Sequence, residues 1–117
     1  MDKEELKRRT KQYALRIVKL IKALPKNMAG KVIGNQLLRS GTSVGSNYRA
    51  ACRARSKIEF IAKLGIVIEE ADESAFWIEL IIEAQLLKQE LMEPLLKETK
   101  EILAIMIASA NSASRNK

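Results

Sequence analysis

The sequence predicts an all-α protein: an antiparallel up-down-up-down four-helix bundle that forms one domain over residues 1–117. Apolar residues recur at spacings of three and four along four segments, which is the period of a helix with one buried face. No segment alternates apolar and polar residues as a half-buried strand does. The chain holds only two prolines and five glycines. The connections are therefore short, and consecutive helices should lie antiparallel.

The first helix is expected over about residues 3–24. Its apolar stripe consists of Leu6, Tyr13, Ile17, Leu20 and Leu24. Asp2 and Glu5 have the spacing of a capping box, in which side chains satisfy the free N–H groups of the first turn. Pro25 ends the helix because the residue before a proline is disfavoured in the helical conformation.

The second helix is expected over about residues 28–54, with Asn27 as its N-cap. Its stripe consists of Ile33, Leu37, Gly41, Val44, Tyr48 and Ala51. Two pairs of glycines lie on one helix face, Gly30 with Gly34 and Gly41 with Gly45. Each glycine costs a helix up to about 1 kcal/mol relative to alanine, so we expect these pairs to let a neighbouring helix approach closely.

The third helix is expected over about residues 57–88 and begins with a capping box from Ser56 to Glu59. Its core stripe consists of Phe60, Leu64, Val67, Ala71, Ser74, Ile78 and Ile81. A second apolar face consists of Ile66, Trp77 and Leu80. Because a helix that is apolar on two sides needs two neighbours, we expect this second face to be an oligomer interface. The alternative is that the helix lies at the centre of its own bundle.

The fourth helix is expected over about residues 94–110, with Pro94 in its first turn. Its stripe consists of Leu95, Thr99, Ile102, Met106 and Ser109. Residues 111–117 are rich in serine and asparagine, and we expect this tail to fray.

The composition argues against an enzyme and against a metal site. The run Gly41–Gly45 matches the nucleophile-elbow pattern around Ser43, but it lies inside a helical stripe, and the chain has no histidine to act as base. Carboxylate-bridged metal bundles use Glu-x-x-His motifs, which this chain cannot form. The single cysteine, Cys52, excludes an internal disulfide. We therefore predict no catalytic residues, no cofactor and no metal.

The sequence also predicts a protein of the cytoplasm that does not enter a membrane. No run reaches the roughly 18 apolar residues that a membrane span needs. The charged start of the chain does not fit a secretory signal.

Charge is divided between the two halves of the chain. Residues 1–57 hold 15 basic and three acidic residues, a net charge of +12, whereas residues 58–117 hold six basic and 11 acidic residues, a net charge of −5. Because a field of one sign attracts polyanions, the basic half is a candidate phosphate-contacting surface. The alternative is that the two halves pair within the fold. The candidate nucleic-acid contacts are Arg9, Arg16, Lys19, Lys22, Lys26, Arg49, Arg53, Arg55 and Lys57.

A polar network is expected between the second and third helices. Two carboxylates flank the second apolar face of the third helix, where they would be costly without partners. On the second helix, polar side chains recur at helical spacing at Gln36, Ser40, Ser43 and Asn47. We expect them to face and satisfy the carboxylates; the alternative is that both sets are solvated. The predicted network consists of Arg39, Ser43, Asn47, Glu70 and Glu73.

The middle of the chain resembles the four-helix-bundle proteins of 23S rRNA intervening sequences. The resemblance covers about residues 10–108, and the matching runs are QLLRSGTSVGSNYR at 36–49, CRARS at 52–56, EFIAKL at 59–64 and EADESAFWIEL at 70–80. It implies an up-down bundle that assembles as a ring-like homopentamer. It also implies kinship with the accessory variability determinant of diversity-generating retroelements, a basic pentamer that associates with a reverse transcriptase and nucleic acid. The resemblance implies structural roles for the five network residues and supplies no catalytic residue.

Together these features predict a non-enzymatic, oligomeric helical bundle that binds nucleic acid, RNA in particular, without sequence specificity. The alternative is a protein-interaction scaffold that recruits a partner such as a reverse transcriptase. The acidic second half departs from the uniformly basic surface of the retroelement relative.

Overall fold

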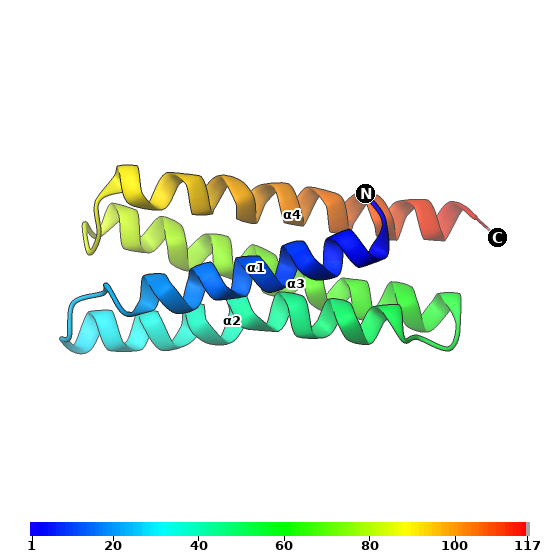
Figure 1. The fold of residues 1–117 in the computed structure, drawn as a ribbon, viewed down its shortest axis with the longest axis horizontal. Coiled ribbons are helices and arrows are strands. Elements are labelled where there is room, and N and C mark those ends of the chain that lie inside the picture. Colours follow the sequence, from blue (N-terminus) through cyan, green and yellow to red (C-terminus); the bar gives the residue numbers. More distant parts are fainter. Residues whose placement is uncertain (117) are drawn as a thin grey trace.

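The computed structural model describes residues 1–116 as four helices: α1 (Lys3–Ile21), α2 (Met28–Cys52), α3 (Lys57–Glu83) and α4 (Gln89–Arg115). Each helix runs back along the one before it, so that the molecule is a rod measuring 49 × 21 × 19 Å with both termini at one end (Figure 1). The predicted all-α four-helix bundle is confirmed. No helix among residues 1–116 is long and apolar enough to cross a membrane.

Three of the four helices begin at side-chain caps. Asp2 accepts a hydrogen bond from the Glu5 backbone N–H at 2.8 Å, and Asn27 accepts one from Gly30 at 2.9 Å. Ser56 accepts one from Glu59 at 3.1 Å. Each cap stabilises its helix by about 1 kcal/mol, because it satisfies an N–H group that the helix itself leaves free.

The helix ends differ more from the predicted bounds. α1 stops at Ile21 rather than residue 24, with two turn-type bonds leading toward Pro25. α2 stops at Cys52 rather than residue 54. α3 stops at Glu83 rather than residue 88, because Gln85 adopts a left-handed conformation with φ of 57°. The N–H of Leu86 then bonds to the Ile81 carbonyl at 3.0 Å, as in a Schellman motif that closes a helix.

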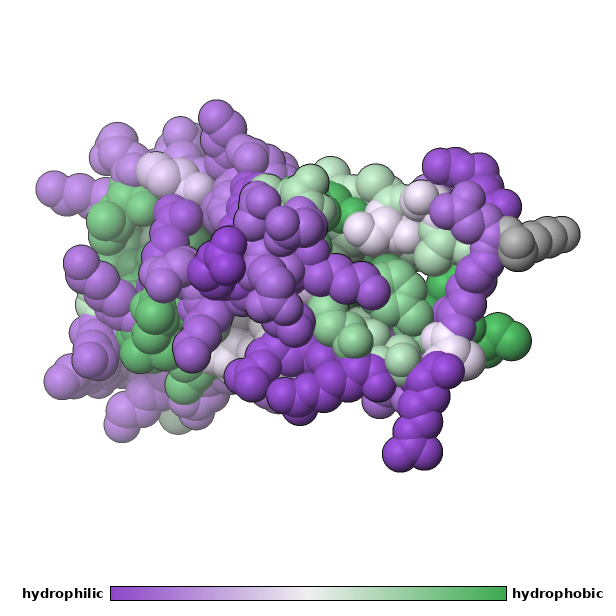
Figure 2. Space-filling model, turned by 45° about the vertical axis from the view of Figure 1, so that its right-hand side comes forward, coloured by the Kyte–Doolittle hydropathy of each residue, from purple (hydrophilic) through white to green (hydrophobic). Residues whose placement is uncertain are grey.

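α4 is longer than predicted at both ends. It begins at Gln89, five residues before Pro94, and brings the fully buried Met92 onto the same stripe as Leu95. It continues to Arg115, so the predicted fraying does not hold for residues 111–115; Lys117 lies outside the described residues. The last turns stay helical where they border a groove at the end of the bundle. This groove measures about 720 Å³, and its lining includes Leu6, Tyr48, Phe60, Ile105 and Ala108. Figure 2 shows hydrophobic surface in this half of the molecule, framed by hydrophilic side chains.

The core lies along the axis of the bundle and uses the predicted stripes of all four helices. α1 and α2 approach closely at two glycines. A Cβ atom at Gly41 would lie 2.8 Å from Ile17, and one at Gly45 would lie 3.3 Å from the backbone carbonyl of Thr10. These contacts explain why α2 tolerates glycines that lower its intrinsic helix propensity.

α1 and α4 are joined by polar links. The hydroxyl groups of Tyr13 and Thr99 are 2.6 Å apart in the buried interior. Burial raises the pKa of Tyr13 to about 12, since the phenolate would lose its hydration.

Candidate functional site

The α1–α2 hairpin carries most of the exposed positive charge of the protein. Within residues 1–116, no carboxylate forms an ion pair with eight of the nine predicted nucleic-acid contacts. All eight side chains are exposed; they are Arg16, Lys19, Lys22, Lys26, Arg49, Arg53, Arg55 and Lys57.

Arg9 is the exception, and its predicted role is corrected. Its guanidinium group donates two hydrogen bonds to Glu98, at 2.6 and 2.7 Å, and a third to Glu101 at 3.0 Å. These bonds raise the pKa of Arg9, chiefly through Glu98. The side chain is only 23% exposed, so its charge is neutralised inside the fold. Arg9 therefore links α1 to α4 and is not available as a phosphate contact. For this residue the alternative holds, in which the basic and acidic halves of the chain pair within the fold.

One basic groove lies between the start of α1 and the end of α2. It has a volume of about 300 Å³ and is lined by Glu4, Lys7, Arg8, Lys11, Arg49 and Arg53. Lys7 pairs with Glu4 at 3.0 Å, and the other four cations have no carboxylate partner among the described residues. We call Lys7, Arg8, Lys11, Arg49 and Arg53 the proximal cluster. The sequence prediction included the two α2 arginines and missed the three α1 residues. Two signals could have found them. They lie three, four and seven residues after Glu4, which places them on one side of a helix. The predicted antiparallel hairpin also brings the start of the first helix beside the end of the second.

A second basic groove lies at the other end of the same hairpin. It has a volume of about 250 Å³, and its lining combines Ile21, Leu24, Gly30 and Gly34 with three lysines, Lys22, Lys26 and Lys31. We call these lysines the distal cluster. Lys31 was missed by the sequence prediction. Arg16 and Lys19 line neither groove, and Arg55 and Lys57 lie at the turn into α3.

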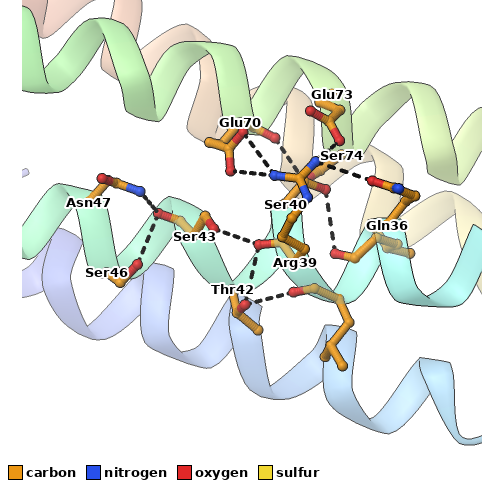
Figure 3. Close-up of polar contacts among 12 residues, drawn as sticks. Gln36, Arg39, Ser40, Thr42, Ser43, Ser46, Asn47, Glu70, Glu73 and Ser74 are labelled. Carbon is orange, nitrogen blue, oxygen red and sulfur yellow. Dashed lines mark hydrogen bonds and ion pairs between the residues drawn. The ribbon is translucent and has the colours of Figure 1, made fainter.

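The α2–α3 contact contains an ion-pair network centred on Arg39 (Figure 3). One guanidinium nitrogen donates to Glu70 at 3.1 Å, and the other donates to Glu73. The Trp77 indole N–H donates to the same Glu73 carboxylate at 3.0 Å. Glu70 and Glu73 therefore find their partners in one arginine and one tryptophan.

The other two predicted network residues bond within their own helix. The Ser43 hydroxyl donates to the Arg39 carbonyl at 2.6 Å, and the Asn47 amide donates to the Ser43 carbonyl at 2.8 Å (Figure 3). Contrary to the expectation, they do not bond to the carboxylates; each side chain bonds instead to the backbone carbonyl one turn back in its own helix. A buried bond of 2.9 Å between Ser40 and Ser74 links the two helices instead.

The outer face of α3 exposes apolar side chains. Of the three predicted interface residues, Ile66 is 41% exposed, whereas Trp77 and Leu80 are half-buried. The sequence prediction missed Ile58 and Phe76, which are 82% and 55% exposed. Phe76 packs edge-on against Trp77 with ring centroids 5.0 Å apart. Gly65 lies on the same helix, and a Cβ atom there would meet nothing within 4 Å.

No group of three histidine, cysteine or acidic side chains within residues 1–116 is placed to hold a metal ion. The chemistry that this surface offers is electrostatic: two clusters of cations along one hairpin, beside a half of the molecule whose charges are mostly acidic.

Residues 3–108 match the family model described as 23S rRNA-intervening sequence protein. The chain belongs to this family. The crystal structure of a protein of unknown function from the S23 ribosomal protein family of Bacteroides thetaiotaomicron is similar, with 36% sequence identity and a TM-score of 0.88. The match covers 95% of this chain and 99% of that chain, so the whole bundle is the common fold. A comparison with curated proteins finds no match.

Proposed function

We propose that this member of the 23S rRNA-intervening sequence family is a non-enzymatic, oligomeric bundle that binds nucleic acid, RNA in particular, through its phosphates. The observation that carries the proposal is the uncompensated charge of the α1–α2 hairpin. Residues 6–58 contain no aspartate or glutamate, and eight predicted contacts, six on this hairpin and two at the turn into α3, are exposed and lack ion-pair partners within residues 1–116.

Phosphate contacts of this kind bind with a characteristic salt dependence. Each cation that neutralises a phosphate releases condensed counterions, so the logarithm of the association constant falls linearly with the logarithm of salt concentration. The slope is about −0.7 per contact for a single strand and about −0.9 for a duplex. Phosphate contacts carry no sequence information of their own, so sequence preference should be weak.

A salt titration tests the proposal. We expect several unrelated RNAs to bind with similar affinity at about 50 mM salt and to lose at least about tenfold by 200 mM. The double variant Arg49→Gln/Arg53→Gln should weaken binding of every RNA equally and make the slope shallower. Lys88→Gln/Lys97→Gln removes the same charge from the α3–α4 side and is the matched control. Binding that is absent at low salt, or indifferent to salt, would refute the proposal.

We further propose that the protein acts as a homo-oligomer, with the pentamer that the family resemblance implies. Ile58, Ile66 and Phe76 on the outer face of α3 support a subunit contact there, since exposed apolar side chains in one region mark interfaces. Five copies of the formal charge of +7 would give an assembly of +35. Native mass spectrometry should detect one closed oligomer, which Ile66→Glu/Phe76→Glu converts to monomer. Leu91→Glu on α4 is the control that should leave the mass unchanged, and a monomeric wild-type protein would end this proposal.

A protein-interaction scaffold is the second candidate function, and the same apolar face of α3 favours it. Under this alternative the chain alone is monomeric and captures one specific protein, such as a polymerase, with fixed stoichiometry after nuclease treatment. Loss of that capture in Ile66→Glu/Phe76→Glu, with unchanged RNA binding, would assign the face to a partner rather than to a second copy.

A further inference from the structure

The two basic clusters lie on one continuous surface of the α1–α2 hairpin. Lys11, Leu15, Val18 and Lys22 follow one another at spacings of four, three and four residues, so they share one face of α1. On α2 the matching stripe runs from Lys31 through Leu38 and Thr42 to Arg49, in steps that also keep to one face. The proximal and distal clusters are therefore the two ends of a single seam.

The middle of this seam differs in chemistry from its ends. Leu15 is 54% exposed and Val18 is also exposed, while Leu38 and Thr42 are half-buried. The only carboxylate that lines either basic groove is Glu4, at the outer end of the proximal one. The seam thus offers cations at both ends and an uncharged, partly apolar floor between them.

Single-stranded nucleic acid has the complementary chemistry. Its phosphates can enter both clusters, while its unpaired bases present apolar faces to Leu15 and Val18. A duplex keeps its base faces stacked inside and presents only its sugar-phosphate surface, so the apolar floor would contribute nothing to its binding. An acidic peptide lacks a regular row of planar apolar groups to cover the floor.

We infer that the α1–α2 seam is a binding track for single-stranded nucleic acid, with phosphates held in the proximal and distal clusters and bases lying over Leu15 and Val18. This inference rests on the proposed function and specifies the strand state and path of its ligand.

The length of the track sets the length of the ligand. Lys31 and Arg49 are 18 residues apart on α2, which corresponds to about 27 Å at 1.5 Å per residue. A strand stacked at about 3.4 Å per nucleotide needs about eight nucleotides to cover that span. A tetranucleotide can therefore occupy one cluster only, whereas a 12-mer reaches both and gains from the second contact being intramolecular.

The test measures fluorescence anisotropy with labelled mixed-sequence RNA and DNA single strands of 4, 8 and 12 nucleotides, and with a 12-base-pair duplex. We expect the 12-mers to bind at least about tenfold more tightly than the 4-mers, with the step near eight nucleotides. The duplex should bind more weakly than the single strands. Circular dichroism on every variant checks that the bundle is intact.

Matched variants separate the two ends and the floor. Arg49→Gln/Arg53→Gln and Lys22→Gln/Lys31→Gln should each reduce 12-mer affinity to near that of the 4-mer. Lys88→Gln/Lys97→Gln, with the same loss of charge, should change it less than about twofold. Leu15→Ser/Val18→Ser keeps every charge and should weaken single strands several-fold, with no change for the duplex.

The outcomes distinguish this inference from the proposed function. If long RNA binds with strong salt dependence but without a length step, or the duplex binds as tightly as the single strand, the track is refuted while phosphate binding stands. If only one cluster contributes, the track is likewise refuted. If no probe binds at low salt, both proposals fall.

Discussion

The buried hydroxyl pair between α1 and α4 gives a prediction in which a second mutation repairs the first. The Thr99 hydroxyl donates its hydrogen to the Leu95 carbonyl at 2.8 Å. In the 2.6 Å contact between Tyr13 and Thr99, the tyrosine must then be the donor. Removing the Tyr13 hydroxyl therefore leaves no donor without an acceptor, whereas removing the Thr99 hydroxyl leaves the Tyr13 O–H without one.

The expected magnitudes follow from this asymmetry. Tyr13→Phe removes the donor and leaves Thr99 with its own bond to Leu95, so the free energy of unfolding should fall by about 1 kcal/mol. Thr99→Val strands the Tyr13 hydroxyl in a side chain that is 1% exposed, which should cost about 1–3 kcal/mol. Ser74 also lies near the Tyr13 hydroxyl, and rescue by its oxygen would give the lower value. The double variant leaves two apolar side chains in contact and should be more stable than Thr99→Val alone.

Urea denaturation of the wild type, both single variants and the double variant measures these four free energies as a double-mutant cycle. The four proteins should share one m-value, since none changes the area exposed on unfolding. Strictly additive losses, or a double variant less stable than Thr99→Val, would show that the hydroxyl pair is not the link described here.

Three further predictions concern stability. Gln85→Gly should raise the free energy of unfolding, measured in urea, by about 0.5–1 kcal/mol, because glycine adopts the left-handed conformation without a Cβ clash. As a control, Gln89→Gly within α4 should lower the free energy of unfolding. Gly41→Val should cost about 1–3 kcal/mol in thermal melts by forcing α1 and α2 apart, while Gly65→Ala should stabilise a monomer by up to about 1 kcal/mol; equal effects at both sites would contradict the packing described. Because the pKa of Tyr13 is raised to about 12 in the folded state, its stabilising contribution is complete below pH 10 and is lost as the pH rises toward 12. The stability advantage of the wild type over Tyr13→Phe should shrink across that interval, and a constant difference would disprove the shift.

Local signals made the starts of the first three helices predictable, whereas the end of α3 and the start of α4 were not. Asp2, Asn27 and Ser56 cap their helices through neighbours three residues away, so the sequence around each cap contains the whole interaction. The end of α3 requires Gln85 in the left-handed conformation, and glutamine is not a residue type that predicts this conformation. The early start of α4 follows from the burial of Met92, which depends on the other helices.

For the candidate site, the sequence predicted the excess of cations but not which cations are unpaired or which of them lie together. The excess of cations in the first half is plain in the sequence, and Arg49 and Arg53 were singled out from it. Which cation is free depends on partners distant in the chain: Arg9 is neutralised by Glu98, 89 residues away. Arg8 joins the proximal cluster only because the antiparallel hairpin brings the start of α1 beside the end of α2.

The start of α1 and the end of α4 lie at the same extremity of the rod, and the start of α1 borders the proximal cluster (Figure 1). A bulky fusion partner or affinity tag on the N-terminus would cover that cluster and weaken the binding of a phosphate ligand without changing the fold. The connection over residues 84–88 lies at the opposite extremity, the same one as the α1–α2 connection that carries Lys22 and Lys26, so a dye, spin label or surface tether there leaves the proximal cluster clear but not the distal one. Joining the present ends and opening the chain at that connection would yield a circular permutant with all four helices uncut, whose reporter groups lie at the extremity opposite the proximal cluster.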